Sequence, residues 1–239
     1  MRFNRIFISL FCLFALVICG CSSAAAVNQG EQEMTDAAFI DTLTFLGDST
    51  TAHMLSRAPL KDGAASKQIW ATKNRYLNLS SRITYEKIVC PQNGEEMTIA
   101  RAAATVRPQF LVITLGIDYG VYYYRNDLKT FSLYYEKLID AITAASPETV
   151  IVLQSIFPVG RGSSVITNEM VDRANGAISD IAERRNLVFV DAATPLKDAE
   201  GYLAEKYCYS EDGIHLTHDA YAMIFENLKK YECEITGVK

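Results

Sequence analysis

Positive charge is in short supply in this sequence. Its 239 residues include 23 Lys and Arg against 28 Asp and Glu, which gives a formal net charge of −5. A nucleic-acid partner needs a basic surface for its phosphates, and this composition does not provide one. The charge balance therefore argues against nucleic-acid binding and is compatible with a neutral or modestly charged ligand.

Histidine and cysteine are also rare. Three of the six cysteines fall within the first 21 residues, and the three that remain are irregularly spaced. Such a set fits neither a disulfide framework nor a zinc site, although one bridge can form in an oxidising compartment. We take these three as structural: Cys90, Cys208 and Cys233. Any imidazole base must come from the only three histidines, which are His53, His215 and His218.

The N-terminus resembles a targeting signal. An apolar run from Ile6 to Ile18 follows two arginines and precedes Cys19-Gly20-Cys21. The run is short for a membrane span, and a small residue directly before a cysteine suits cleavage and lipidation of Cys21. We expect residues 1–20 to be a signal peptide with a lipobox, with a transmembrane anchor or cleavage elsewhere as the alternative. This predicts an extracytoplasmic protein that is lipid-anchored to the membrane at the cell surface.

The remainder of the chain reads as a tether followed by one domain. Residues 21–36 are rich in Ala, Gln, Glu and Ser, as expected of a flexible linker. Residues 37–239 are about 200 in number, which is enough for a single domain with its own core.

Apolar runs alternate with amphipathic stretches through this domain. Short, nearly continuous apolar runs predict buried strands at Leu43–Leu46, Phe110–Leu115, Val150–Ile156 and Leu187–Asp191. Apolar residues at three- and four-residue spacing predict helices at Met97–Thr105, Leu128–Ala145, Asn168–Arg185 and Thr217–Tyr231. One further strand and a surface excursion carrying Trp70 are expected within residues 62–89. The alternation predicts a three-layer α/β/α domain with a parallel sheet.

Two short motifs could supply nucleophilic chemistry at one rim of that sheet. Ser49 follows the first predicted strand, and a serine hydroxyl needs a base to take its proton. His215 lies three residues after Asp212, a spacing that lets the carboxylate orient the imidazole towards a serine. The alternatives are a helix cap or turn for Ser49 and a solvated surface position for His215. His53 is expected to follow Ser49 onto a helix and to point with its own turn, and His218 to lie in the first turn of the last helix.

These motifs resemble the sequence blocks of the SGNH/GDSL hydrolase family. Gly47-Asp48-Ser49-Thr50 is similar to the first block, Asp212-Gly213-Ile214-His215 to the last, and Gly116-Ile117-Asp118 to the third, which is normally Gly-x-Asn. The resemblance implies a flavodoxin-like fold with a five-stranded parallel sheet. It also implies a serine esterase that hydrolyses carboxylic esters through an acyl-enzyme on Ser49, with His215 as base, Asp212 orienting it, and no cofactor or metal.

The resemblance further implies an oxyanion site, and here the chain departs from the family. The expected donors are the Ser49 N–H, a glycine N–H, for which Gly94 is the best candidate, and the third-block side chain. Asp118 stands where asparagine is usual, and an ionised carboxylate cannot donate. Loss of one oxyanion donor lowers a rate by about a hundred- to a thousandfold. Either Asp118 is protonated and donates, or Asn168 has taken over, or hydrolysis is weak; a merely solvated Asp118 is the plainest alternative.

Four tyrosines crowd the loop after Asp118. Tyr119 and Tyr123 are candidates for substrate contact, because aromatic faces can stack on sugars or line an acyl pocket. This indicates a small-molecule or glycan ester, such as an O-acetylated glycan, although the rings can equally pack the loop onto neighbouring helices. The second hypothesis is a catalytically impaired, surface-tethered glycan-binding lipoprotein on the same fold.

Overall fold

The computed structural model describes residues 37–209 and 211–237. The expected signal peptide, the lipidation site at Cys21 and the tether therefore lie outside the described residues. Within these ranges, no helix is long and apolar enough to cross a membrane.

Five parallel strands form one sheet in the order β2-β1-β5-β6-β7. In chain order, the strands are β1 (Leu43–Gly47), β2 (Ile69–Trp70), β5 (Phe110–Thr114), β6 (Val150–Gln154) and β7 (Val188–Val190). This is the flavodoxin-like doubly wound order, in which the chain moves outwards in both directions from the first strand. The predicted fold class is confirmed.

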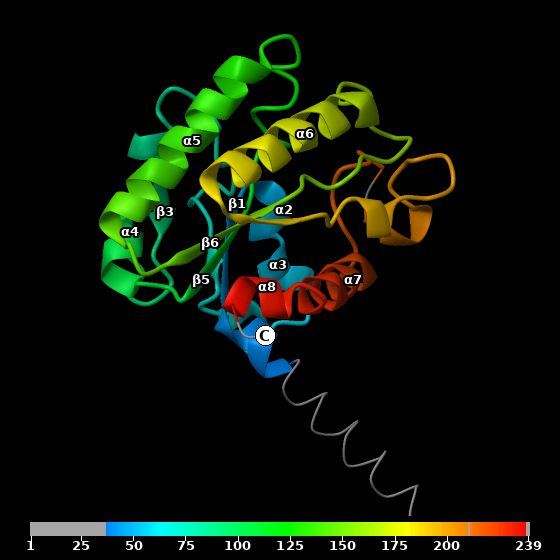
Figure 1. The fold of residues 1–239 in the computed structure, drawn as a ribbon. Coiled ribbons are helices and arrows are strands. Elements are labelled where there is room, and N and C mark those ends of the chain that lie inside the picture. The colour runs from blue at the N-terminus through cyan, green and yellow to red at the C-terminus, as the bar shows by residue number, and fades with distance from the viewer. Residues whose placement is uncertain (1–36, 210, 238–239) are drawn as a thin grey trace, which may run out of the picture. The chain divides into compact units, whose positions relative to one another are not determined.

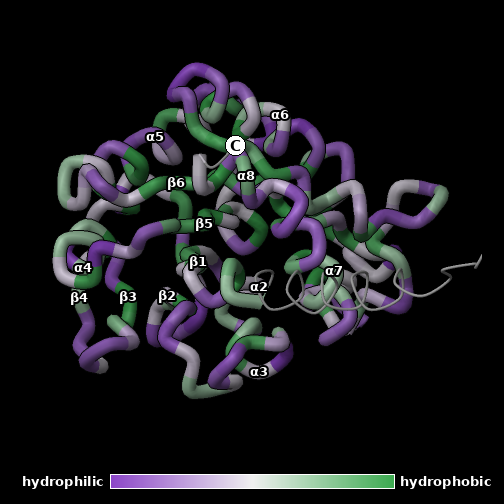
Figure 2. Tube along the Cα trace, turned by 60° about the horizontal axis from the view of Figure 1, so that its bottom comes forward, coloured by the Kyte–Doolittle hydropathy of each residue, from purple (hydrophilic) through white to green (hydrophobic). Residues whose placement is uncertain are grey.

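Helices cover both faces of the sheet (Figure 1). One core cluster joins Leu46, Leu111 and Ile113 to α4, α5 and α6, and a second joins Phe45 and Val112 to α7 and α8. Successive strand residues point to opposite faces, so both layers draw on the same strands. In Figure 2, β5 and β6 are coloured as hydrophobic, whereas hydrophilic and hydrophobic residues alternate along the helices. The bounds are α4 (Ile99–Val106), α5 (Leu128–Ala145), α6 (Asn168–Arg185), α7 (His218–Lys229) and α8 (Glu232–Thr236).

The starts of the four longest helices follow local capping chemistry. In each case the side-chain oxygen of the N-cap residue accepts a hydrogen bond from the backbone N–H three residues later. The caps are Thr98, Asp127, Thr167 and Thr217. The predicted α5 and α6 match the structure at both ends, whereas α4 begins two residues later than predicted because Met97 and Thr98 belong to strand β4.

The stretch between β1 and α4 departs most from expectation. Trp70 lies in β2, pairs in register with Leu46 and is fully buried, so the predicted surface position is wrong. The ring fills space against the α4 side of the core, a long-range contact that the local sequence does not reveal. A two-stranded antiparallel hairpin also forms here, from β3 (Lys87–Val89) and β4 (Glu96–Thr98).

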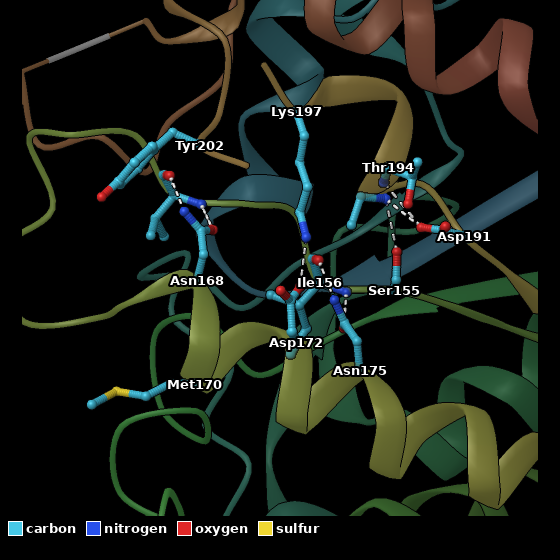
Figure 3. Close-up of polar contacts among 12 residues, drawn as sticks. Ser155, Ile156, Asn168, Met170, Asp172, Asn175, Asp191, Thr194, Lys197 and Tyr202 are labelled. Atoms are coloured by element: carbon cyan, nitrogen blue, oxygen red, sulfur yellow. Dashed lines mark hydrogen bonds and ion pairs between the residues drawn. The ribbon is translucent and has the colours of Figure 1, made fainter. Parts of the chain in front are cut away.

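Asn175 holds the loop after β6 against α6. Its side-chain oxygen accepts from the Ile156 N–H at 2.7 Å, and its side-chain nitrogen donates to the Ile156 carbonyl at 2.9 Å. Figure 3 shows this two-point contact beside Ser155, whose hydroxyl accepts from the Ala192 and Ala193 N–H groups. Asn175 and Ile156 are both buried, so neither polar group has water as a substitute partner.

Asn175→Ala is therefore expected to lower the free energy of unfolding by about 2–4 kcal/mol, because it leaves two buried backbone groups without partners. Chemical denaturation of the purified domain measures this. Arg173→Ala, an exposed substitution in the same helix, serves as the matched control and should cost well under half as much. Equal losses in the two variants would contradict the assignment.

Candidate active site

The candidate site lies between β1 and β5, where the chain reverses the direction in which it adds strands to the sheet. β1 and β5 are adjacent and parallel, and the chain leaves both at the same edge of the sheet. The short helix α2 (Ser49–Ala52) follows β1 almost at once, whereas a loop follows β5. Ligands of doubly wound sheets bind in the crevice between such strand ends. Ser49 and Asp118 stand on the two sides of this point.

Asp48 ties the two strand ends together. One carboxyl oxygen accepts from the Gly116 and Ile117 N–H groups, both at 2.9 Å, and the other accepts from the Thr50 hydroxyl at 3.0 Å. The side chain is buried. Burial, reinforced by the neighbouring Asp118, raises the pKa of Asp48 to about 7 against the lowering effect of these hydrogen bonds. The Ser49 turn is thus fixed relative to Gly116-Ile117.

Asp118 contacts the expected nucleophile twice. Its Oδ2 accepts from the Ser49 N–H at 2.9 Å, and its Oδ1 accepts from the Ser49 hydroxyl at 2.7 Å. Burial raises the pKa of Asp118, whereas the two Ser49 contacts and the charge of His215 lower it. The carboxyl group therefore occupies the backbone donor that an oxyanion would need. This contact excludes the alternative of a merely solvated Asp118 at a strand end.

The segment from Asp212 to His215 forms a tight turn around one carboxylate. The Asp212 Oδ1 accepts from the backbone N–H groups of Ile214 and His215, at 2.8 and 3.2 Å. The other oxygen, Oδ2, lies 2.6 Å from His215 Nδ1. This leaves the imidazole Nε2 as the group available for proton transfer. The three-residue spacing therefore places the carboxylate against the imidazole, as the sequence led us to expect.

Glycine is required inside that turn. Gly213 has a φ of +70°, and a Cβ there would meet the Ser163 nitrogen at 2.6 Å. The Gly213 carbonyl accepts from the Gly160 N–H at 2.7 Å, which attaches the turn to the loop after β6. The position of His215 is therefore determined both by its own turn and by a neighbouring loop.

His53 connects the His215 turn to the Ser49 turn. The His53 N–H donates to the Ser49 carbonyl at 2.9 Å, and its ring packs edge-on against the His215 ring with centroids 4.5 Å apart. His53 follows Ser49 as the C-cap residue of α2, and the contact of its ring with His215 is one that the sequence analysis did not predict. The sequence signal for a His53 near the site was its four-residue spacing from Ser49, because this spacing places the two side chains on one side of a helical turn.

The environment keeps His53 neutral. Burial, followed by the charges of His215, Arg57 and Arg75, lowers the pKa of His53 to about 4. Its Nδ1 atom is buried and has no hydrogen-bond partner among the described residues. Ser49 and His215 share no hydrogen bond within the described structure, in which the Ser49 hydroxyl donates to Asp118 instead.

Two expected oxyanion donors are used elsewhere. The Gly94 N–H donates to the Cys90 carbonyl at 2.7 Å, closing a turn at an exposed position. The Asn168 side chain exchanges two hydrogen bonds with the Val159 backbone, both at 2.8 Å (Figure 3). The Gly94 assignment is therefore corrected, because its N–H already has a backbone acceptor. The Asn168 side chain uses its oxygen and one of its two N–H donors on Val159, so it holds the start of α6 against the loop after β6. A single sequence cannot show which backbone N–H groups the fold consumes.

The tyrosines after Asp118 form a small aromatic cluster. Tyr119 and Tyr123 stack with centroids 3.9 Å apart, and Tyr124 packs edge-on against Tyr134 of α5. Tyr123 remains 58% exposed. The cluster thus packs its loop onto α5 and leaves the Tyr123 ring exposed in the segment that follows Asp118.

His218 is the first residue of α7, as predicted, and its Nδ1 lies 2.8 Å from the Arg57 carbonyl.

In the described part of the chain, no three His, Cys, Asp or Glu side chains gather in a way that could hold a metal ion.

Comparison with known proteins places this geometry in a family. The model of the GDSL-like lipase/acylhydrolase family matches residues 45–223, a range that includes Ser49, Asp118, Asp212 and His215. No curated protein sequence matches the chain.

Solved structures with the same fold include three bacterial proteins. A GDSL-like lipase from Bacteroides thetaiotaomicron is 15% identical, with a TM-score of 0.54 over 87% of this chain and 98% of that one. A candidate acylhydrolase from Bacteroides fragilis is 14% identical, with a TM-score of 0.55 over 80% and 86%. A candidate platelet activating factor from Streptococcus pneumonia is 18% identical, with a TM-score of 0.53 over 88% and 100%. At these identities the structures show the shared fold, while the family model spans most of the chain. The chain therefore belongs to the GDSL-like lipase/acylhydrolase family.

Proposed function

We propose that the protein is a serine esterase that hydrolyses carboxylic esters through an acyl-enzyme on Ser49. The observation that carries the proposal is the 2.6 Å contact between Asp212 and His215 beside the turn that presents Ser49. Membership of an acylhydrolase family supports ester hydrolysis in general. The individual roles rest on geometry and chemistry.

The reaction proceeds in two halves. The Ser49 hydroxyl attacks the ester carbonyl carbon and gives its proton to His215, while Asp212 stabilises the imidazolium. Collapse of the tetrahedral intermediate breaks the bond to the alcohol, which takes the proton from His215. Water then attacks the acyl-enzyme, gives a proton to His215 and releases the carboxylic acid, and the proton returns to Ser49.

Before the attack, the Ser49 hydroxyl must exchange partners. In the resting structure it donates to Asp118, so its side chain has to rotate about χ1 to reach His215. The Ser49 N–H must likewise leave Asp118 Oδ2 before it can stabilise an oxyanion. Breaking these two contacts with Asp118 raises the barrier to attack. We therefore expect hydrolysis to be weak.

Ser49→Ala is expected to lower the hydrolysis of p-nitrophenyl acetate by at least about a hundredfold, because the nucleophile is lost. Release of p-nitrophenolate measures turnover, and labelling by a fluorophosphonate probe reports an activated serine independently. Ser56→Ala is a matched control, since Ser56 is an exposed serine two turns further along the same segment. Equal turnover and equal labelling in wild type, Ser49→Ala and Ser56→Ala would refute the esterase.

Asp118→Asn is expected to raise kcat/KM at neutral pH by about a hundredfold, because it replaces a negative acceptor with an amide donor. The pKa of Asp118 is raised, so the wild-type carboxyl gains its proton at a higher pH than an ordinary aspartate. The ratio of variant to wild-type kcat/KM should therefore be largest at high pH and shrink as pH falls through the Asp118 pKa. The requirement for neutral His215 acts on both proteins and cancels in this ratio.

A pH series from about 4.5 to about 8.5 on both proteins measures that ratio. Asp127→Asn is the control, because it changes the same carboxyl group at an exposed helix cap outside the site. A fall in activity in Asp118→Asn throughout the series would mean that Asp118 works as a protonated donor.

The substrate class follows from the aromatic face beside Asp118. Tyr123 is exposed and stacks on Tyr119, an arrangement that suits the apolar face of a sugar ring. We therefore propose O-acetyl groups on glycans as the target.

The occupied Ser49 N–H favours a second candidate function, a catalytically impaired glycan-binding protein on the same fold. In that case Ser49 would show no labelling by the fluorophosphonate probe.

The proposed location is the outer surface of the membrane, through a lipid at Cys21. This proposal rests on the lipobox-like Cys19-Gly20-Cys21 after the apolar run. Cys21→Ala should abolish metabolic labelling of the protein with radiolabelled palmitate, because one lipid-modified residue would provide the attachment. Immunoprecipitation followed by autoradiography measures this, with Cys233→Ala as the control. Undiminished labelling of Cys21→Ala would contradict the lipid anchor.

A further inference from the structure

A cavity of about 400 Å³ lies along the side of α2 and of α3 (Met54–Arg57). Its wall is mainly apolar and includes Ala52, Leu55 and Ile69, whereas Lys73 and Arg75 supply positive charge. None of the described residues that line it is acidic. The cavity is therefore cationic, although the chain as a whole carries a net charge of −5.

Both cations are exposed and lack a charged partner. Within the described residues, neither Lys73 nor Arg75 forms an ion pair. Arg161 provides a contrast, because its guanidinium bonds Asp198 and Glu200, both at 2.7 Å. The charge of Arg161 is paired with two carboxylates of the same chain, whereas Lys73 and Arg75 can pair with a ligand.

The chain holds Arg75 in place with a compact turn. Arg75 has a φ of +65°, a conformation that few residues other than glycine adopt. The Arg75 N–H donates to the Thr72 carbonyl at 3.0 Å, and Asn74 Oδ1 accepts from the Thr72 hydroxyl at 2.7 Å. Backbone strain of this kind is often found at binding sites, where the surrounding structure maintains it.

The cavity shares helix α2 with the proposed nucleophile. The loop with Lys73 and Arg75 follows β2, whose last residue, Trp70, pairs with Leu46, so it leaves the sheet at the edge where Ser49 lies. Ala52 belongs to the helix that begins at Ser49. The charge of Arg75 also reaches His53, whose ring packs against His215. Arg75 is therefore on the side of the base that protonates the departing alcohol.

We propose that this cavity binds the alcohol part of the ester, and that this part carries a carboxylate recognised by Lys73 and Arg75. The inference rests on the proposed esterase function and deepens it. An acetylated uronic acid has the required chemistry, because its carboxylate can pair with the two cations while the ring lies against Ala52, Leu55 and Ile69. The acetyl group is then expected to reach Ser49, which begins the helix that carries Ala52.

The test compares O-acetylated methyl glucuronide with O-acetylated methyl glucoside, which differ in the carboxylate. Acetate release should give wild type a kcat/KM ratio of about tenfold or more in favour of the acidic sugar. The double variant Lys73→Gln/Arg75→Gln should bring this ratio close to one. Arg101→Gln removes an equal kind of charge from an exposed position on α4 and should leave the ratio unchanged.

A second measurement separates this inference from the esterase proposal. Calorimetry on the Ser49→Ala protein should detect binding of methyl glucuronide, weakened at least about tenfold by the double variant and retained with Lys73→Arg/Arg75→Lys. Thermal melting checks that each variant is folded. If wild type hydrolyses neither these sugars nor p-nitrophenyl acetate, the esterase proposal fails and calorimetry still decides the cavity. Ser49-dependent turnover with the same ratio in wild type and double variant, or no binding of methyl glucuronide, would overturn the inference alone.

Discussion

The geometry of the site depends on the burial of one carboxyl group. Asp48 links the turn after β1 to the loop after β5 through the Gly116 and Ile117 N–H groups. Two backbone donors and the Thr50 hydroxyl compensate for the removal of this group from water, which would otherwise be costly. Ser49 and Asp118 directly follow the two linked segments, so their mutual position is a consequence of this contact.

The same arrangement brings two carboxyl groups close to one nucleophile. Burial disfavours the charged form of both Asp48 and Asp118, and the charge on Asp118 makes ionisation of Asp48 harder still. Asp118 is relieved by accepting both polar hydrogens of Ser49. A stable resting state is thereby obtained at the expense of the donor and hydroxyl that ester hydrolysis requires. An asparagine in this place would remove the conflict, because an amide is neutral and can donate.

The surroundings of His215 combine both signs of charge. Asp212 holds one imidazole nitrogen, and the neutral ring of His53 covers one side. Arg75 adds positive charge beyond His53 and faces the cavity along α2. The Asp212–His215 turn therefore combines an orienting carboxylate with a neutral packing ring, and Arg75 acts electrostatically on that ring. Under the proposed function, this suits a substrate with a polar reacting end and an acidic remote group.

Local sequence was sufficient for much of the fold. The helices α5 and α6 could be predicted at both ends because capping and apolar spacing act within a few residues. Buried parallel strands such as β5 are continuous apolar runs for the same reason. The Asp212–His215 contact was also predictable, since a three-residue turn brings the two side chains together whatever surrounds them.

Tertiary structure alone decided the contacts between segments distant in the chain. The burial of Trp70, the packing of His53 on His215 and the double contact of Asp118 with Ser49 each join separate elements. The hydrogen bond of the Gly94 N–H to Cys90 and the two hydrogen bonds of Asn168 with Val159 have the same origin, because only the folded loops bring these partners near. Side-chain chemistry is written in the sequence, but which partner each group meets depends on long-range packing.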